Sequence, residues 1–297
     1  MENIETNILV PLDFSEQSLN ALEMAVPFAN LIKAQIIILY VDQDKGKLSK
    51  FFSSDSNDKF EDEVKKQLMT LAEEASKKHN LKVGYHFMRG SSVHGKIVEY
   101  AEEIRSEMIV MGKGSLVTDY KDPFPILGSN TSRVIRYATC PVITTGFPPR
   151  NHDCKQIMLP LDLTKETRQK VTWAIKLAHL FHSEIKVVSA LWATSDDTIE
   201  KQLVMQLRQV EAFINKSGIK CTAQIVKETQ DAKSLVPILL KFVETEGDID
   251  LIMIMTQQEM NFSEYFVGSH ASELIRKAQV PVMSVIPRDM GEIVLGL

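Results

Sequence analysis

The residues best suited to chemistry in this sequence are those that could hold an anion. Gly128, Ser129 and Asn130 open a predicted helix. The free backbone N–H groups and the positive dipole end of such a helix start favour phosphate or another anion. Gly112 and Gly114 follow a predicted strand, and their lack of side chains lets the backbone approach a ligand closely. These two groups together predict a binding site for a phosphate-bearing small molecule.

The elements that must position these residues occur twice along the chain. The segment 8–41 is matched without a gap by 157–190, and the segment 127–145 is matched by 267–285. A repeat of this length, with its start and end signatures in the same order, indicates two copies of one domain. Each copy has about 145 residues, a normal size for a domain with its own core.

Within each copy, short runs of Ile, Leu and Val alternate with longer stretches of helical period. This pattern is typical of βαβ units around a buried parallel sheet. We expect an α/β fold with two tandem doubly wound domains, each a five-stranded parallel sheet with helices on both faces. Two prolines and a run of polar residues in 147–155 interrupt regular structure, which places the domains at 1–148 and 149–297.

The carboxylate of Asp13 is expected to join the same site. Asp13 directly follows the first predicted strand, whereas Gly112 and Gly114 follow the fourth. Ligands of an open doubly wound sheet lie outside the carboxyl ends of the strands, where the strand order reverses. We therefore expect Asp13, the glycine pair and the helix start at Gly128 to face one crevice.

Composition excludes several classes of partner. The 297 residues carry a net charge of -5, which gives no electrostatic reason to expect nucleic acid. No apolar run approaches the length of a membrane span, and the amino terminus lacks the pattern of a secretory signal. Three cysteines without metal-ligand spacing fit a reducing compartment. We expect a cytoplasmic protein that binds neither nucleic acid nor membrane and holds no metal in a dedicated site.

The chain resembles the universal stress proteins in their tandem two-domain form. The resemblance rests on four motifs: V-P-L-D before Phe14, I-V-M-G ending at Gly112, G-S-x-x-S-x-x-I-R at both helix starts, and C-P-V or V-P-V before each last strand. It implies the strand order 3-2-1-4-5 and an adenine nucleotide such as ATP, with Mg²⁺ as a possible companion. It also implies that Asp13 and the backbone of Val41 hold the nucleoside, while the glycine loop, Gly128 and Ser129 hold the phosphates.

The glycine spacing departs from the family pattern G-x2-G-x9-G-[ST]. One residue separates Gly112 from Gly114, and thirteen residues separate Gly114 from Gly128. The longer segment could close over phosphates, with Lys113 or Lys121 supplying positive charge, or it could fill the site.

Copy two departs further from the pattern. Asp162, Gly268 and Ser269 remain, but the fourth strand leads into Thr-Gln-Gln-Glu at 256–259, without glycine. Side chains there occupy the space that a close backbone approach requires, and Glu259 adds a negative charge. The sequence therefore predicts a nucleotide site in domain one and a degenerate phosphate loop in domain two.

Two alternatives stay open. In the first, both sites have lost nucleotide and the chain is an interaction scaffold. In the second, Gly90-Ser-Ser-Val-His-Gly-Lys96 is a phosphate-binding P-loop, although Ile97 stands where Ser or Thr would bind Mg²⁺. No catalytic constellation is recognisable, so we expect slow ATP hydrolysis at most and no dedicated enzyme.

The last strand of each copy is apolar and would form an exposed sheet edge. The segments near 142–146 and 281–286 are expected to pair with each other within the chain. That pairing would relate the two domains by a pseudo-two-fold axis and mimic the family dimer. Dimerisation of whole chains is left open.

Overall fold

The computed structural model describes most of the chain. The described residues are 6–43, 54–114, 126–149, 153–161, 167–192, 196–228, 234–255, 257–258, 265–266 and 269–286. They form a tandem α/β fold, as the sequence predicts. The exact domain boundary at 148/149 stays a prediction.

Domain one alternates strands and helices throughout. Its elements are β1 (Asn7–Pro11), α1 (Glu16–Ile32), β2 (Gln35–Gln43), α2 (Ser54–His79), β3 (Val83–Gly90), α3 (Val93–Glu103), β4 (Met108–Gly112), α4 (Ser129–Tyr137) and β5 (Val142–Thr145). Each strand after β1 is reached through a helix, which is the connection that parallel neighbours require.

Domain two repeats this order and adds two short strands. Its elements are β6 (Gln156–Pro160), α5 (Thr167–Phe181), β7 (Glu184–Trp192), α6 (Asp197–Lys216), β8 (Cys221–Glu228), α7 (Val236–Glu246), β9 (Leu251–Met255), β10 (Gln257–Gln258), β11 (Tyr265–Phe266), α8 (Ser269–Lys277) and β12 (Val282–Val285). The antiparallel pair β10–β11 was not anticipated from the sequence.

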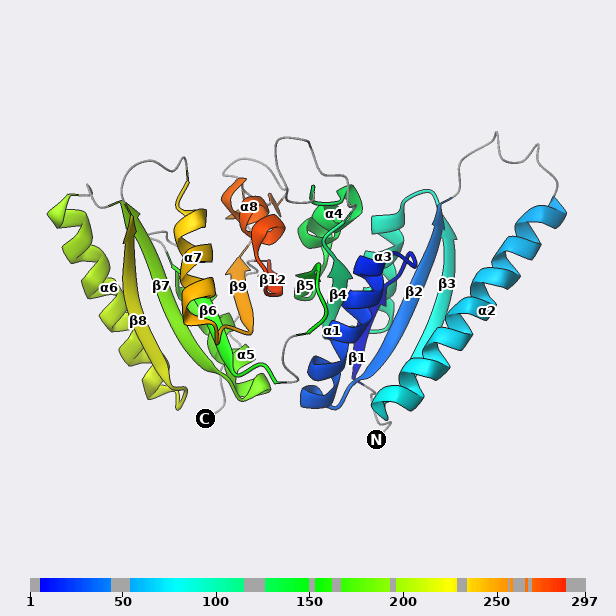
Figure 1. Cartoon of the computed structure of the whole chain (residues 1–297), viewed down its shortest axis with the longest axis horizontal. Helices are drawn as coiled ribbons and strands as arrows, with labels where there is room; N and C mark the ends of the chain where they lie inside the picture. Colours follow the sequence, from blue (N-terminus) through cyan, green and yellow to red (C-terminus); the bar gives the residue numbers. More distant parts are fainter. Residues whose placement is uncertain are drawn as a thin grey trace.

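One ten-stranded sheet runs through both domains in the order β3-β2-β1-β4-β5-β12-β9-β6-β7-β8. Each half has the order 3-2-1-4-5, so the series reads the same from either edge (Figure 1). Neighbouring strands are parallel except at the centre, where β5 and β12 are antiparallel with Ile143 opposite Met283. Thr144 Oγ1 also donates to the Val282 carbonyl at 3.2 Å. The two halves therefore share a backbone ladder.

Helices cover both faces of this sheet. Helices α1, α2, α5 and α6 pack on one apolar layer, and α3, α4, α7 and α8 pack on the other. Successive residues of β1 alternate between them, since Ile8 and Val10 belong to the first layer and Leu9 to the second. The rings of Phe28 and Phe181 lie 5.1 Å apart and join α1 to α5 across the domains.

A serine caps the start of α1. Ser15 is the N-cap residue, and its side chain accepts a hydrogen bond from the Ser18 N–H at 3.3 Å. This cap turns the chain from the end of β1 into the helix and so places Asp13 at the carboxyl edge of the sheet. In the described part of the chain, the helices are each too short or too polar to cross a membrane.

Candidate functional site

The candidate site begins where β1 ends. Asp13 follows this strand, and Phe14 takes a positive φ of 61°, which turns the chain toward α1. Asp13 Oδ1 accepts hydrogen bonds from the Ser15 N–H at 3.0 Å and from Ser15 Oγ at 2.5 Å. The carboxylate is thereby held in one place while remaining exposed to solvent.

Its surroundings keep Asp13 ionised. Partial burial raises the pKa of this carboxyl group, but hydrogen bonds from Ser15 and Ser18 outweigh that effect and place the pKa below its ordinary value. At neutral pH Asp13 is therefore an acceptor, suited to the amino or hydroxyl donors of a ligand.

Val41 lies beside Asp13 at the end of the neighbouring strand. The ladder between β1 and β2 ends with Pro11 opposite Leu39, where the Leu12 N–H donates to the Leu39 carbonyl at 2.8 Å. Asp13 and Val41 each lie two residues beyond this last pair. On its other side Val41 pairs with Met88 of β3. The edge of Val41 that faces β1 is thus beyond the ladder, where a ligand can meet the main chain.

Gly112 ends β4 at the point where α1 passes closest to the sheet. A Cβ atom at this position would lie 3.0 Å from Gln17 Cβ and 3.2 Å from the main-chain carbonyl of Gln17. The carboxamide of Gln17 then accepts a hydrogen bond from the Gly114 N–H at 2.9 Å. Glycine is required here because the helix backbone leaves no room for a side chain.

The three glycines meet despite their unusual spacing. The Gly128 N–H donates to the Lys113 carbonyl at 2.9 Å, and Thr131 Oγ1 donates to the Gly112 carbonyl at 3.0 Å. A Cβ atom on Gly114, whose φ is 126°, would lie 2.2 Å from the Gly128 nitrogen. The thirteen residues between Gly114 and Gly128 therefore do not separate the two parts of the site.

Gly128 is the N-cap residue of α4, and no side chain caps this helix. Because the Gly128 N–H is already bonded to Lys113, the donors at the helix start are those of Ser129, Asn130 and Thr131. Ser129 is exposed and Asn130 is half-buried. The structure brings Gly112, Gly114 and Gly128 into contact at the start of α4, which Ser129 and Asn130 form, and it places Asp13 and Val41 at the carboxyl ends of the neighbouring strands β1 and β2. Sequence reasoning missed Gln17, since nothing in its local pattern sets it apart from other polar helix residues.

The sequence matches a known protein family over both of its copies. The model of the Universal stress protein family matches residues 6–145 and 154–285. The chain belongs to the universal stress protein family. A universal stress protein of Methanocaldococcus jannaschii is 29% identical over 161 residues, which are 50% of this chain and 86% of that protein.

Solved structures share the fold of this universal stress protein over nearly its whole length. A universal stress protein from Archaeoglobus fulgidus DSM 4304 matches with a TM-score of 0.71 and 19% identity, covering 97% of this chain and 99% of its own. A protein of unknown function from Pseudomonas aeruginosa PAO1 matches with a TM-score of 0.60 and 16% identity, covering 95% and 93% of the two chains. An Archaeoglobus fulgidus family member was solved in complex with dAMP; it covers 44% of this chain and 96% of its own, with 20% identity and a TM-score of 0.36.

The expected phosphate contact of Lys113 is wrong for this universal stress protein. The Lys113 side chain is only 2% exposed and turns into the seam between the domains. Its ammonium group donates to the Ala278 carbonyl and lies 5.8 Å from the centre of the Phe147 ring. Burial lowers the pKa of Lys113 to about 8. The other candidate cation, Lys121, lies outside the described residues.

The P-loop interpretation is also wrong. Ser92 caps α3 and accepts from the Gly95 N–H at 3.2 Å, as at an ordinary helix start. Lys96 pairs with Glu99 at 2.7 Å, and a Cβ atom on Gly90 would lie 2.8 Å from Lys96 Cγ. The lysine stem therefore covers the first glycine and directs its ammonium group along the helix.

Domain two lacks the glycine that opens the first site. Val142 pairs with Ile109 in domain one and Val282 pairs with Ile252 in domain two, so Met255 occupies the position of Gly112. Met255 is buried. The short pair β10–β11 follows it directly, and β11 lies beside α4 of domain one. Asp162, Glu259 and Gly268 lie outside the described residues, while Ser269 begins α8.

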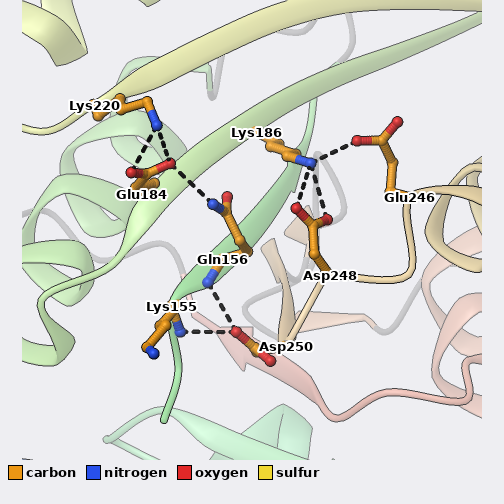
Figure 2. A network of polar contacts seen from close by, with 8 residues as sticks. All are labelled: Lys155, Gln156, Glu184, Lys186, Lys220, Glu246, Asp248 and Asp250. Atoms are coloured by element: carbon orange, nitrogen blue, oxygen red, sulfur yellow. Dashed lines mark hydrogen bonds and ion pairs between the residues drawn. The ribbon is translucent and has the colours of Figure 1, made fainter. Parts of the chain in front are cut away.

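A charged network occupies the opposite edge of domain two, at the amino ends of its strands (Figure 2). Lys186 pairs with Glu246 at 2.5 Å and with Asp248 at 2.9 Å, and Lys220 pairs with Glu184 at 2.8 Å. Around them, Gln156 donates to Glu184, and the N–H groups of Lys155 and Gln156 donate to Asp250. These charges satisfy one another, so we interpret the network as structural.

Proposed function

We propose that domain one binds an adenine nucleotide such as ATP at the carboxyl edge of β1 and β4, and that domain two is degenerate at its phosphate loop. The observation that carries this proposal is the meeting of Gly112, Gly114 and Gly128 beside the uncapped start of α4. A helix start whose N–H groups have no side-chain cap suits a phosphate group.

Each part of the site has a role in this proposal. Asp13 and the main chain of Val41 hold the nucleoside. The N–H groups of Ser129 and Asn130 and the Ser129 hydroxyl hold phosphate oxygens, while Gly112 and Gly114 give the ligand room. Gly128 contributes space rather than a hydrogen bond, since its N–H is bonded to Lys113. Mg²⁺, if it accompanies the nucleotide, is held mainly by the phosphates.

Any hydrolysis is expected to be slow. The groups that converge at the phosphate end are hydrogen-bond donors, and the ionised carboxylate of Asp13 lies at the nucleoside end in this proposal. We therefore propose a binding protein whose signal is its occupied or empty state, rather than a dedicated enzyme.

A charge placed at the helix start tests the site. Ser129→Glu puts a carboxylate where the phosphate would lie, although an acidic residue at a helix N-terminus favours the helix itself. ATP affinity measured by calorimetry is expected to fall at least about 30-fold, because repulsion is added to lost hydrogen bonds. Ser269→Glu makes the same change at the start of α8 in domain two and is expected to leave affinity unchanged. Equal affinity in the wild type and Ser129→Glu would reject the site.

The alternative is an interaction scaffold in which neither domain binds nucleotide. The bond between Gly128 and Lys113 favours it, because one of the donors that a phosphate would use is already satisfied. Mass spectrometry of gently purified protein separates the two proposals: a retained adenine nucleotide supports the first, and its absence together with no ATP binding in calorimetry supports the second.

We further propose that the antiparallel join of β5 and β12 replaces the pairing between protomers of the family dimer, so that one chain suffices. Among the described residues, Cys140, Cys154 and Cys221 form no disulfide, which supports a reducing, cytoplasmic location. Sedimentation over a range of protein concentrations tests the first point, and a monomer throughout is the expected result.

A further inference from the structure

Lys113 belongs to the candidate site through its main chain. It stands between Gly112 and Gly114. Its N–H donates to the Thr145 carbonyl at 3.1 Å, and its carbonyl accepts from the Gly128 N–H at 2.9 Å. Lys113 therefore carries the one side chain of a Gly-Lys-Gly loop. Contacts of this side chain can fix the position of the loop.

Domain two binds the side chain of Lys113. The Lys113 ammonium group donates to the carbonyl of Ala278, the residue that follows α8, and it lies over the ring of Phe147 in the segment between the domains. Among the described residues, the ion pairs do not include this lysine, and the C-terminal end of a helix is a place where a cation is favoured. A buried cation with a fixed carbonyl partner holds its loop in one position.

Helix α8 lies between the contact of Lys113 and the position in domain two that corresponds to the site of domain one. It begins at Ser269, the equivalent of Ser129, and ends at Lys277, one residue before the carbonyl that Lys113 contacts. In domain two the position of Lys113 is taken by Thr256, an uncharged residue outside the described part of the chain. The two halves are therefore not equivalent, because a lysine extends from domain one to α8 and no lysine stands at the matching position of domain two.

We propose that Lys113 is a positioning residue through which domain two holds the phosphate loop of domain one. Nucleotide bound in domain one then also stabilises α8. This inference rests on the proposed function, since it concerns the same loop. Coupling between two positions is reciprocal: if domain two favours the binding-competent loop, the bound ligand favours the contact with α8. A degenerate second domain is then needed as an anchor, even without a ligand of its own.

Lys113→Met tests the anchor, because methionine keeps the length and apolar stem but loses the ammonium group. Lys96→Met is the matched control: it removes the same charge from a helix start, at a lysine whose ion-pair partner among the described residues is Glu99 on its own helix. We expect ATP affinity, measured by calorimetry, to fall about tenfold in Lys113→Met and less than twofold in Lys96→Met. Equal affinity in Lys113→Met and wild type would overturn the proposal.

Hydrogen exchange followed by mass spectrometry gives a readout that a general loss of structure would not produce. In the wild type, saturating ATP is expected to slow amide exchange in both α4 and α8. In Lys113→Met, at saturating ATP, the protection of α4 is expected to remain and that of α8 to disappear. Binding of ATP to the wild type without protection of α8, or protection that persists in Lys113→Met, overturns this inference alone. Failure of the wild type to bind ATP overturns the proposed function as well.

Discussion

The two domains share one strand order and differ at both edges of their sheets. At the carboxyl edge, domain one has Gly112 where domain two has the buried side chain of Met255. At the amino edge, Gln35 of domain one donates to Asn7 at 2.6 Å, whereas the equivalent Glu184 of domain two pairs with Lys220 at 2.8 Å, beside the charged pairs of Lys186. The comparison shows that the two domains share the fold that their buried layers define, while the residues at the two ends of their strands differ in size and charge.

The largest effect is expected when Gly112 of domain one is replaced by methionine, the residue that domain two has at this position. Gly112→Met forces a side chain against the backbone of Gln17, which lies 3.2 Å from the Cβ position. We expect ATP binding to become undetectable by calorimetry and the free energy of unfolding to fall by about 2 to 3 kcal/mol through overpacking. Met255→Gly is the reverse change, and binding of a second nucleotide by that variant would show that the difference at this position alone decides occupancy.

A second prediction concerns the pH dependence of Lys113. Its pKa is about 8 in the folded protein and near 10.5 when exposed. Between these values the unfolded chain binds the proton and the folded chain has released it, so this residue makes the free energy of unfolding rise with pH. The rise amounts to about 3 kcal/mol at most.

Denaturant unfolding of wild type and Lys113→Met at pH 7 to 10.5 measures this term, because other titrating groups cancel in the difference. Methionine is expected to be the more stable residue at pH 7, where the charge is buried, and this advantage is expected to shrink as the pH rises. A difference that does not change with pH would show that Lys113 is not buried as a cation.

The amino edges can be compared by exchanging one residue. Lys186 occupies the position of Ile37 in domain one, since the pairs Gln156–Glu184 and Asn7–Gln35 are equivalent. Lys186→Ile leaves Glu246 and Asp248 without their cation, and we expect a loss of about 1 kcal/mol because both carboxylates are partly exposed. The loss should be smaller in high salt when measured by denaturant unfolding. A loss that salt leaves unchanged would point to packing of the lysine stem instead.

The smallest expected effect is at the start of α1. Ser15→Ala removes the cap of this helix and the hydroxyl donor to Asp13, while the backbone N–H donor remains, at a cost of about 0.5 kcal/mol. The pKa of Asp13, followed by NMR, should rise toward its ordinary value. An unchanged pKa would show that Ser15 does not hold the carboxylate.

Much of the fold and part of the site could be predicted from the sequence. The strands follow from apolar runs such as 8–12. The start of α1 follows from Ser15, because a cap acts within one turn of the helix. Gly112, Gly114 and Gly128 were correctly grouped, since their positions after a strand and before a helix decide where they lie whatever the length of the segment between them. These features depend on local chemistry and on the general geometry of parallel sheets.

The remaining features depend on contacts between distant segments. The direction of Lys113 is set by the end of α8, 165 residues away, and no local pattern reports that distance. The strands β10 and β11 have two residues each and are too short to show a period. The charged pairs of Lys186 likewise join β7 to Glu246 at the end of α7 and to Asp248 just beyond it.

The antiparallel join between β5 and β12 has a consequence for how such a protein can change. In an assembly of two identical chains, every mutation appears in both copies at once, so neither site can be altered alone. Here the halves meet at any dilution because the peptide chain connects them, and a single codon change reaches only one. One half can therefore lose its glycine while the other keeps it.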